Sequence, residues 1–392
     1  MRIGRRRRTG SPVRSRLTKA GWVFVVACVV VAIVAMNSGL ALLFLMLGAM
    51  VGGVYVSWLL ARRMVAAARV RRDVPARCRQ NQRVSLGYLL RSVRGGGACL
   101  ALRIEELDAR AAALEPAACG YLPARGGVLA HSETTPRRRG RIRLRRLRLS
   151  TTFPFGLIAS ARQSTQEASL VVWPARGRLV AALLGKGEAE SADVAPSIRS
   201  GGQDEFYGLR EYRLGDNARW IHWRRSAGRG EPVIREMARP RPRTVWVVLD
   251  TYLPDASPPV RAARERAIRF AATLIEDALA GGYRVGAALA YDARVVVVSP
   301  ADRRTQKQRL LDALADIDDN AVHRLPDAIA RLRPAWLRQA HVVVISAAEA
   351  EESLTPETLA RLRRDSRNLT LAAGARIGGL FRDNELAARE DA

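Results

Sequence analysis

The stretch AGWVFVVACVVVAIVAMNSGLALLFLMLGAMVGGVYVSWLLA, residues 20–61, determines how the rest of the chain is arranged. It holds 42 consecutive residues without a charge, between Lys19 and Arg62, whereas one membrane-spanning helix needs about 20 apolar residues. The run is interrupted once, at Asn37-Ser38-Gly39, where three poor helix formers favour a tight turn. It therefore predicts a hairpin of two transmembrane helices, residues 20–36 and 40–61.

Basic residues flank both ends of the predicted hairpin. Residues 1–19 hold eight Lys and Arg and no acid, and five arginines lie between Arg62 and Arg72. Because basic flanks stay on the cytoplasmic side, we expect a multi-pass protein of the inner or plasma membrane, with both termini and all soluble domains cytoplasmic. A cleaved signal peptide is the alternative, but no small-x-small cleavage site separates the two apolar segments, and the second would still anchor the chain.

The net charge of +28 raises the alternative of a nucleic-acid or anionic-polymer binder. The charge is unevenly spread, because residues 1–72 hold thirteen basic residues and residues 137–148 hold eight arginines, both without an acid. The first of these stretches flanks the apolar run, so anionic lipid headgroups explain it better than DNA does. Membrane lipids are therefore the expected partner, and no specific nucleic acid is expected.

Residues 73–178 show the pattern of short strands separated by Gly- and Pro-containing breaks. Within the arginine run, Ile142 and Leu144, then Leu147 and Leu149, alternate with arginines, as in a strand with one face on a core and one in solvent. An antiparallel β-sandwich is expected. The predicted strands are 83–93, 101–106, 128–133, 141–149 and 169–173.

Residues 179–202 are rich in glycine and small residues and are predicted to be a linker. Beyond a polar-aromatic segment, residues 203–237, strands and helices alternate from residue 244 to residue 376, which predicts a mostly parallel sheet with helices on both faces. Residues 377–392 are expected to be a C-terminal tail. The predicted strands are 245–249, 284–290, 295–298, 341–345 and 368–372, and the helices are 258–280, 302–317 and 356–364.

The motifs of several enzyme classes are missing from the sequence. No glycine-rich turn follows the strand that ends at Asp250, and neither a GxxxxGK[ST] phosphate loop nor a GxSxG nucleophile elbow occurs. The four histidines show no metal-binding spacing. We therefore expect a protein that is not an enzyme and that carries no cofactor, and Asp250 is the natural site candidate at the end of its strand.

The segment EFYGLREYRLGDNARWIHWRRSA, residues 205–227, is dense in arginines and aromatic residues. Asp216 can cap a helix that Gly228 ends, and on such a helix Trp220, Trp223 and Ala227 would share one face. Two interpretations are open: an internal network in which the arginines pair with Glu205, Glu211 and Asp216, or a surface for a partner or a phosphate. The candidate partner-binding residues are Arg210, Tyr212, Asp216, Arg219, Trp220, Trp223 and Arg224.

This segment resembles the signature of the bacterial domain of unknown function 58 family, E-F-x-G-L-R-x-Y-x-x-G-D-x-x-R-x-I-x-W-x-x-S-A. The resemblance extends to the apolar hairpin and to Pro154-Phe155-Gly156-Leu157, which closes the β region. It implies a membrane-anchored α+β multidomain protein, with an Ig-like β region followed by a von Willebrand factor A-like α/β domain. It also implies an accessory or assembly role beside a MoxR-type AAA+ ATPase, and other envelope membrane proteins are further candidate partners.

Metal-binding von Willebrand A domains use a D-x-S-x-S motif after the first strand, because Mg²⁺ prefers oxygen ligands in an octahedral array. Here Asp250 keeps the first position, but Tyr252 and Pro254 occupy the two serine positions. We expect Asp250 to bond nearby backbone amides instead of a metal. Three functions thus remain: a non-enzymatic accessory protein for assembly or envelope maintenance, a binder of anionic polymers, and a metal-dependent adhesion domain.

Overall fold

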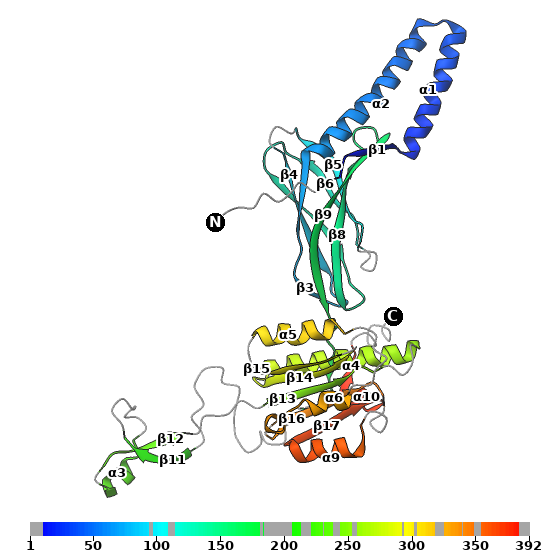
Figure 1. The fold of residues 1–392 in the computed structure, drawn as a ribbon. Helices are drawn as coiled ribbons and strands as arrows, with labels where there is room; N and C mark the ends of the chain where they lie inside the picture. The colour runs from blue at the N-terminus through cyan, green and yellow to red at the C-terminus, as the bar shows by residue number, and fades with distance from the viewer. Residues whose placement is uncertain are drawn as a thin grey trace. The chain divides into compact units, whose positions relative to one another are not determined.

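The computed structural model describes residues 11–93, 97–108, 114–180, 183, 206–212, 221–229, 231–237, 244–252, 257–291, 294–301, 304–317, 325–338, 340–348 and 354–383 (Figure 1). The chain forms two compact units. The first comprises Met1–Ala175 and Leu311–Ile317, and the second comprises Arg176–Leu310 and Asp318–Ala392.

Two helices near the N-terminus form the expected hairpin. Helix α1 spans Lys19–Ser38 and helix α2 spans Ala41–Ala67, and both are long and apolar enough to cross a membrane. Gly39 ends α1 in the left-handed conformation, with φ 66°, and its N–H donates to the carbonyl of Ala35. α2 continues six residues beyond the predicted end at Ala61, because Arg62 and Arg63 are good helix formers that extend past the apolar segment.

The hairpin is joined to the β region at the N-terminus of α1. Thr18 caps the helix, since its Oγ1 accepts from the N–H of Gly21 at 2.9 Å. The same hydroxyl lies 2.7 Å from the carbonyl oxygen of Gly156, and the N–H of Thr18 donates to the carbonyl of Leu157 at 3.0 Å. The Pro154–Leu157 element is thus the turn to which the N-terminus of α1 is hydrogen-bonded.

The β region of the first unit consists of two sheets. A three-stranded antiparallel sheet has the order β2-β4-β7, and a six-stranded sheet has the path β1-β9-β8-β5-β6, with β3 parallel to β9. The strands are β1 Arg14–Leu17, β2 Ala68–Asp73, β3 Arg77–Arg79, β4 Val84–Ser92, β5 Cys99–Glu106, β6 Ala117–Leu122, β7 Gly127–Thr134, β8 Gly140–Thr151 and β9 Ile158–Trp173.

The arginine run forms strand β8, as expected. Leu144, Leu147 and Leu149 are buried, whereas Arg143 and Arg145 are exposed. The register shifts between Leu144 and Arg146, and this irregularity explains why the alternation of apolar residues changes phase in the sequence. Four strands were not expected from the pattern, namely β1, β2, β3 and β6, and β9 begins eleven residues earlier than predicted.

A shared apolar cluster packs the two sheets together, with residues such as Leu90 of β4 and Ile104 of β5. A buried ion pair also joins them, because the guanidinium of Arg72 in β2 lies 2.7 Å from the carboxylate of Glu106 in β5. The Tyr88 hydroxyl donates to the same carboxylate at 3.2 Å. This network fixes β2, the strand that directly follows α2, in place.

The second unit is built on a five-stranded sheet with the order β15-β14-β13-β16-β17. All neighbouring strands are parallel except β14 and β15. The strands are β13 Thr244–Asp250, β14 Arg284–Tyr291, β15 Arg294–Ala301, β16 Ala340–Ser346 and β17 Asn368–Ala373, and the helices include α4 Pro258–Ala280, α6 Leu325–Ala330, α7 Pro334–Leu337, α9 Pro356–Asp365 and α10 Arg376–Leu380. Helix α5, Arg304–Ala315, begins in this unit, and its residues from Leu311 on belong to the first.

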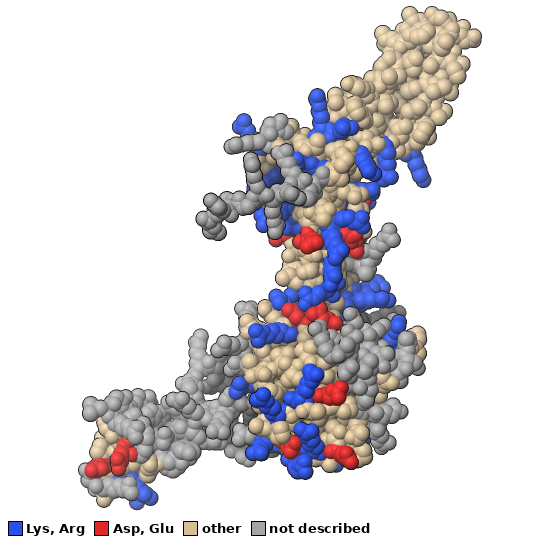
Figure 2. Space-filling model, viewed as in Figure 1, with Lys and Arg blue, Asp and Glu red and all other residues tan. Residues whose placement is uncertain are grey.

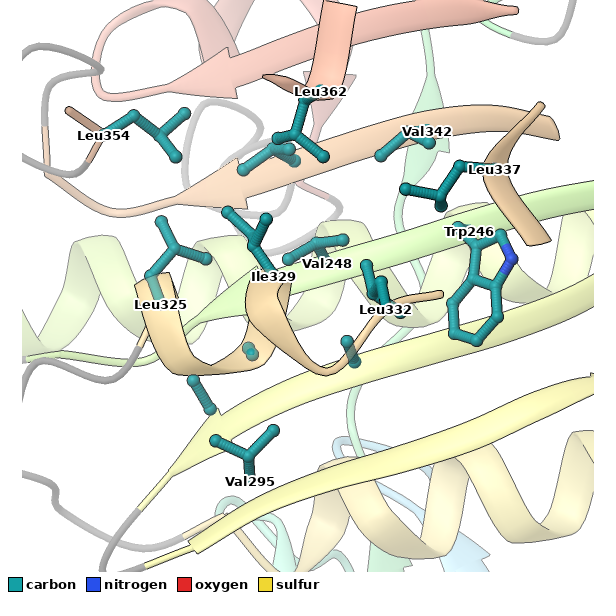
Figure 3. Close-up of a cluster of buried hydrophobic side chains, with 14 of the residues drawn as sticks. Trp246, Val248, Val295, Leu325, Ile329, Leu332, Leu337, Val342, Leu354 and Leu362 are labelled. Atoms are coloured by element: carbon teal, nitrogen blue, oxygen red, sulfur yellow. The ribbon is translucent and has the colours of Figure 1, made fainter. Parts of the chain in front are cut away.

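Helices cover both faces of this sheet. On one face, Trp246 and Val248 of β13 pack against Ile329 of α6 and Leu362 of α9 (Figure 3). Helix α4 contributes nothing to that cluster but contacts β13, β14 and β16, so it lies on the other face. The predicted mixture of helices with a mostly parallel sheet is therefore correct for this unit.

The ends of the second unit are more ordered than expected. Strand β10, Arg178–Leu179, spans the predicted boundary between the β region and the linker, and it pairs with β18, Phe381–Arg382, inside the range predicted to be a tail. Asp383 then forms a buried ion pair with Arg269 of α4. The strands are two residues long, too short for any periodicity to reveal them. Residues 184–202 of the predicted linker lie outside the described residues.

Candidate partner-binding module

A hairpin and one short helix form the region that corresponds to the arginine-aromatic segment. Strand β11, Phe206–Glu211, pairs antiparallel with β12, Val233–Met237, and helix α3 spans Trp223–Arg229. An isolated bridge joins Ile221 to Ile234, and the N–H of Tyr212 donates to the carbonyl of Pro232 at 2.9 Å. We call these three elements the Trp223 module.

Helix α3 is attached to β12 by hydrogen bonds around Ser226 and His222. The Ser226 hydroxyl donates to the His222 carbonyl at 3.1 Å and accepts from the N–H of Val233 at 2.9 Å. His222 in turn donates its N–H to the carbonyl of Val233 at 2.8 Å, and its Nδ1 accepts from the N–H of Arg225. Val233, Ile234 and Ser226 are buried. One side of α3 is thus held against β12 by polar groups whose hydrogen bonds are made within the module.

The other side of α3 is open. Trp223 is 68% exposed, and Arg224, Arg225 and Ala227 are also exposed. A tryptophan that is not needed to fill the core of its own module leaves a large apolar surface free beside two guanidinium groups. Tryptophan and arginine are the residue types most enriched among the energetically important contacts of protein interfaces.

The structure brings only some of the predicted site residues together. Trp223 and Arg224 lie side by side at the start of α3, and Tyr212 is half-buried directly after β11. Arg210 lies in β11 opposite Ile234, and its side chain is outside the described part of the chain. Asp216, Arg219 and Trp220 also lie outside the described residues.

The predicted helix was wrong in its extent. It was expected to begin after Asp216 and to end at Gly228, but α3 begins at Trp223 and includes Gly228 and Arg229. Ile221 pairs with Ile234 in an isolated bridge, so this residue belongs to the hairpin and not to the helix, whereas residues 213–220 lie outside the described part of the chain. This long-range pairing overrides the local capping signal. The sequence analysis did not name Arg225 as a candidate, although it directly follows Arg224. It also did not foresee that Ser226 joins α3 to β12 by hydrogen bonds.

Asp250 lies at the carboxyl end of β13, as predicted, and is 2% exposed. One carboxylate oxygen accepts from the N–H of Tyr252 at 3.1 Å, and the other accepts from the Ser346 hydroxyl at 3.3 Å. The Thr251 hydroxyl donates to the carbonyl of Ala290. Among the described residues this edge offers one carboxylate and the hydroxyls of Thr251 and Ser346, which both donate to other oxygen atoms. This set does not fit the oxygen array that Mg²⁺ requires. No cluster of three or more His, Cys, Asp and Glu occurs in the described part of the chain.

One known protein family matches the part of the chain that contains the Trp223 module and most of the α/β sheet. Residues 208–371 match the model of the family described as protein of unknown function DUF58. This stretch is a DUF58 region. It runs from β11 to β17, so it includes the whole of α3 and the edge at Asp250, whereas the hairpin and the β sheets of the first unit lie outside it. No curated protein matches the chain. Since the function of the family is unknown, membership of the DUF58 region assigns no activity.

Proposed function

We propose that this chain is a non-enzymatic interaction protein held at a membrane, and that the Trp223 module is its partner-binding surface. The observation that carries the proposal is the exposure of Trp223 beside Arg224 and Arg225 on a helix whose other side is fixed by Ser226. A rigid, exposed indole gives binding energy without a large loss of conformational entropy. The complementary partner face is an apolar pocket with carboxylates at its rim.

The hairpin α1–α2 supports the proposal that the chain is held in a membrane. Residues 20–61 of the hairpin carry no charge and many of their apolar side chains are exposed, and Figure 2 shows the outer part of the hairpin without Lys, Arg, Asp or Glu. Such a surface is stable in hydrocarbon and unfavourable in water. The basic residues at both ends favour the orientation in which the termini and both soluble regions are cytoplasmic.

A MoxR-type AAA+ ATPase is the partner that we propose, on the strength of the family resemblance. A cytoplasmic orientation supports it, because the Trp223 module would then face the compartment that contains ATP. The role would be an accessory one in assembly or envelope maintenance. We further propose that the two-sheet region is Ig-like and that the α/β sheet is von Willebrand factor A-like. The shared apolar cluster of the two sheets and the mostly parallel sheet with helices on both faces support these assignments.

The proposal is tested by co-purification of the detergent-extracted full chain with a MoxR-type ATPase from the same cells. Two substitutions remove the proposed contacts, Trp223→Ala and Arg224→Glu. Two matched controls change similar exposed residues elsewhere: Tyr121→Ala in β6, at a side chain that is 58% exposed, and Arg363→Glu in α9. We expect each module variant to reduce the recovered ATPase at least tenfold, as for loss of an important interface residue worth about 2 kcal/mol, and the controls to retain it.

Equal recovery of the ATPase with all four variants would exclude the Trp223 module as the binding surface. Failure to recover any ATPase with the unaltered chain, under conditions that retain other membrane complexes, would exclude the partner itself.

A further inference from the structure

A cavity of about 1250 Å³ lies in the first unit, beside the C-terminal end of α2. Its wall is formed by Ala66 of α2, by β2 and by β9, with residues 11–13 at one side. The polar part of the wall is basic, and the apolar part includes Leu147 and Leu149. Figure 2 shows Lys and Arg gathered where the apolar hairpin meets the β strands. The arginines that line the cavity are Arg69, Arg71, Arg72 and Arg162.

Only one of these arginines has its charge balanced by a carboxylate in the described part of the chain. Arg72 forms the buried pair with Glu106, at 2.7 Å. Arg69 and Arg162 donate hydrogen bonds to the carbonyl oxygens of Ala66 and Ala68, which carry no net charge. Glu167 is the acidic residue among the described lining residues, and its side chain is exposed to solvent. The wall therefore keeps a net positive charge.

Two of the guanidinium groups meet at a single point. Arg69 from β2 and Arg162 from β9 both donate to the carbonyl oxygen of Ala68, at 3.2 and 2.7 Å. Partial burial lowers the pKa of Arg162, and the nearby positive charge of Arg69 lowers it further. Two like charges held together in a half-buried place are unfavourable unless an anion lies between them.

Capping of the helix end does not explain this pair. Arg69 does cap α2, because its Nη1 donates to the carbonyl of Ala66 at 2.9 Å. Arg162, however, comes from β9, which is distant in sequence. The planar forks of two guanidinium groups match the oxygen atoms of a phosphate, which can accept two hydrogen bonds from each.

The cavity also lies at the right depth for a lipid. Arg62 marks the end of the apolar segment of α2, and Ala66 lies four residues further along the helix. At 1.5 Å per residue this is about 6 Å, a distance within the headgroup layer that borders the hydrocarbon core. We propose that this cavity binds the phosphate of an anionic membrane lipid headgroup between Arg69 and Arg162. The proposal rests on the membrane position of the hairpin, and it is independent of the Trp223 module.

The experiment measures thermal unfolding of the full chain in neutral detergent with added lipid. Phosphatidylglycerol should raise the Tm by about 5 °C more than phosphatidylcholine does, since a ligand that binds the folded state stabilises it. The double variant Arg69→Gln/Arg162→Gln should lose more than half of this difference. The variant Arg69→Lys/Arg162→Lys should retain part of it, because each lysine keeps the positive charge but loses the second hydrogen bond of the guanidinium fork.

The matched control is Arg143→Gln/Arg145→Gln, which removes two exposed charges from β8 outside the cavity. It should respond to phosphatidylglycerol as the unaltered chain does. If the double glutamine variant fails to fold, Arg69→Gln alone gives the same comparison, because this side chain is exposed. A response that survives in the glutamine variants of the cavity, or that is lost equally in the control, would overturn the proposal.

A third arm distinguishes a lipid from a soluble anion. Glycerol 3-phosphate offers the same phosphate without acyl chains, and we expect it to raise the Tm much less than phosphatidylglycerol does. An equal rise would assign the cavity to a soluble phosphate and would overturn the lipid assignment. Because the readout does not involve the ATPase, failure here leaves the partner proposal standing, and the reverse also holds.

Discussion

At the scale of single residues, Ser226 has the clearest structural role in the Trp223 module. Its hydroxyl is the acceptor for the N–H of Val233, a buried residue. Ser226→Ala leaves this N–H without an acceptor, which costs about 1–3 kcal/mol of local stability. We expect amide hydrogen exchange at Val233 to accelerate roughly tenfold for each 1.4 kcal/mol lost.

Two controls belong to this measurement. Ser226→Thr keeps the hydroxyl and should preserve slow exchange at Val233. Ala227→Ser changes the next residue, which is exposed, and should have little effect. Unchanged exchange in Ser226→Ala would show that the hydroxyl does not hold α3 against β12.

His341 connects two strands of the α/β sheet and makes stability depend on pH. Its Nε2 lies 2.8 Å from the Thr370 hydroxyl, and burial lowers the pKa of this imidazole below its ordinary value. Below about pH 6.5 the unfolded chain therefore binds the proton more readily than the folded chain, so stability falls as the pH decreases. The slope is less than about 1.4 kcal/mol per pH unit, the limit for one proton.

Denaturant unfolding at pH 7 and at pH 5 measures this effect. His341→Gln should reduce the difference in unfolding free energy between the two pH values. His131→Gln, at an exposed histidine in β7, is the control and should leave the difference as it is. An equal pH dependence in the unaltered chain and in His341→Gln would refute the role of His341.

At the scale of elements, the contact between α1 and the Pro154–Leu157 turn requires a glycine at position 21. A Cβ added at Gly21 would lie 2.1 Å from the carbonyl oxygen of Leu157, a backbone atom that cannot rotate away. Gly21→Ala should therefore separate α1 from the turn and cost about 1–3 kcal/mol or more. The measurement is the Tm of the full chain in detergent.

Gly48→Ala is the matched control, because nothing lies within 4 Å of the added Cβ and the residue lies inside α2, away from both ends. It should leave the Tm equal or slightly higher, since alanine favours a helix more than glycine does. A drop in Tm of the same size in both variants would point to the helices themselves instead of the contact with Leu157.

At the scale of the whole molecule, the orientation in the membrane is the prediction with the widest consequence. If both ends of the hairpin are cytoplasmic, protease added to inverted membrane vesicles should digest the chain beyond residue 67, whereas protease added outside intact spheroplasts should leave it whole. Alkaline carbonate should not extract the chain in either case, because two apolar helices hold it in the bilayer. Digestion by protease outside the spheroplasts would show that the soluble regions lie on the opposite side of the membrane, and it would exclude a cytoplasmic ATPase as the partner.

The sequence by itself determined the elements that depend on local composition and period. The uncharged run of residues 20–61 has the length of two membrane-spanning helices, which is why the hairpin was predictable. The apolar face of residues 258–280 predicted a helix, and α4 has the same bounds. The strands of the α/β sheet were also predictable, because buried parallel strands are continuous apolar runs.

Only the tertiary structure decided which distant residues meet. The pairing of β10 with β18, the bridge that takes Ile221 out of the predicted helix, and the approach of Arg69 and Arg162 to one carbonyl oxygen all join segments far apart in sequence or override a local signal. Local patterns contain no information on such contacts, because their energy comes from pairing and burial between segments. For this reason the sequence pointed to the segment that contains Trp223 and Arg224 as a candidate surface, whereas the basic cavity became visible only in the structure.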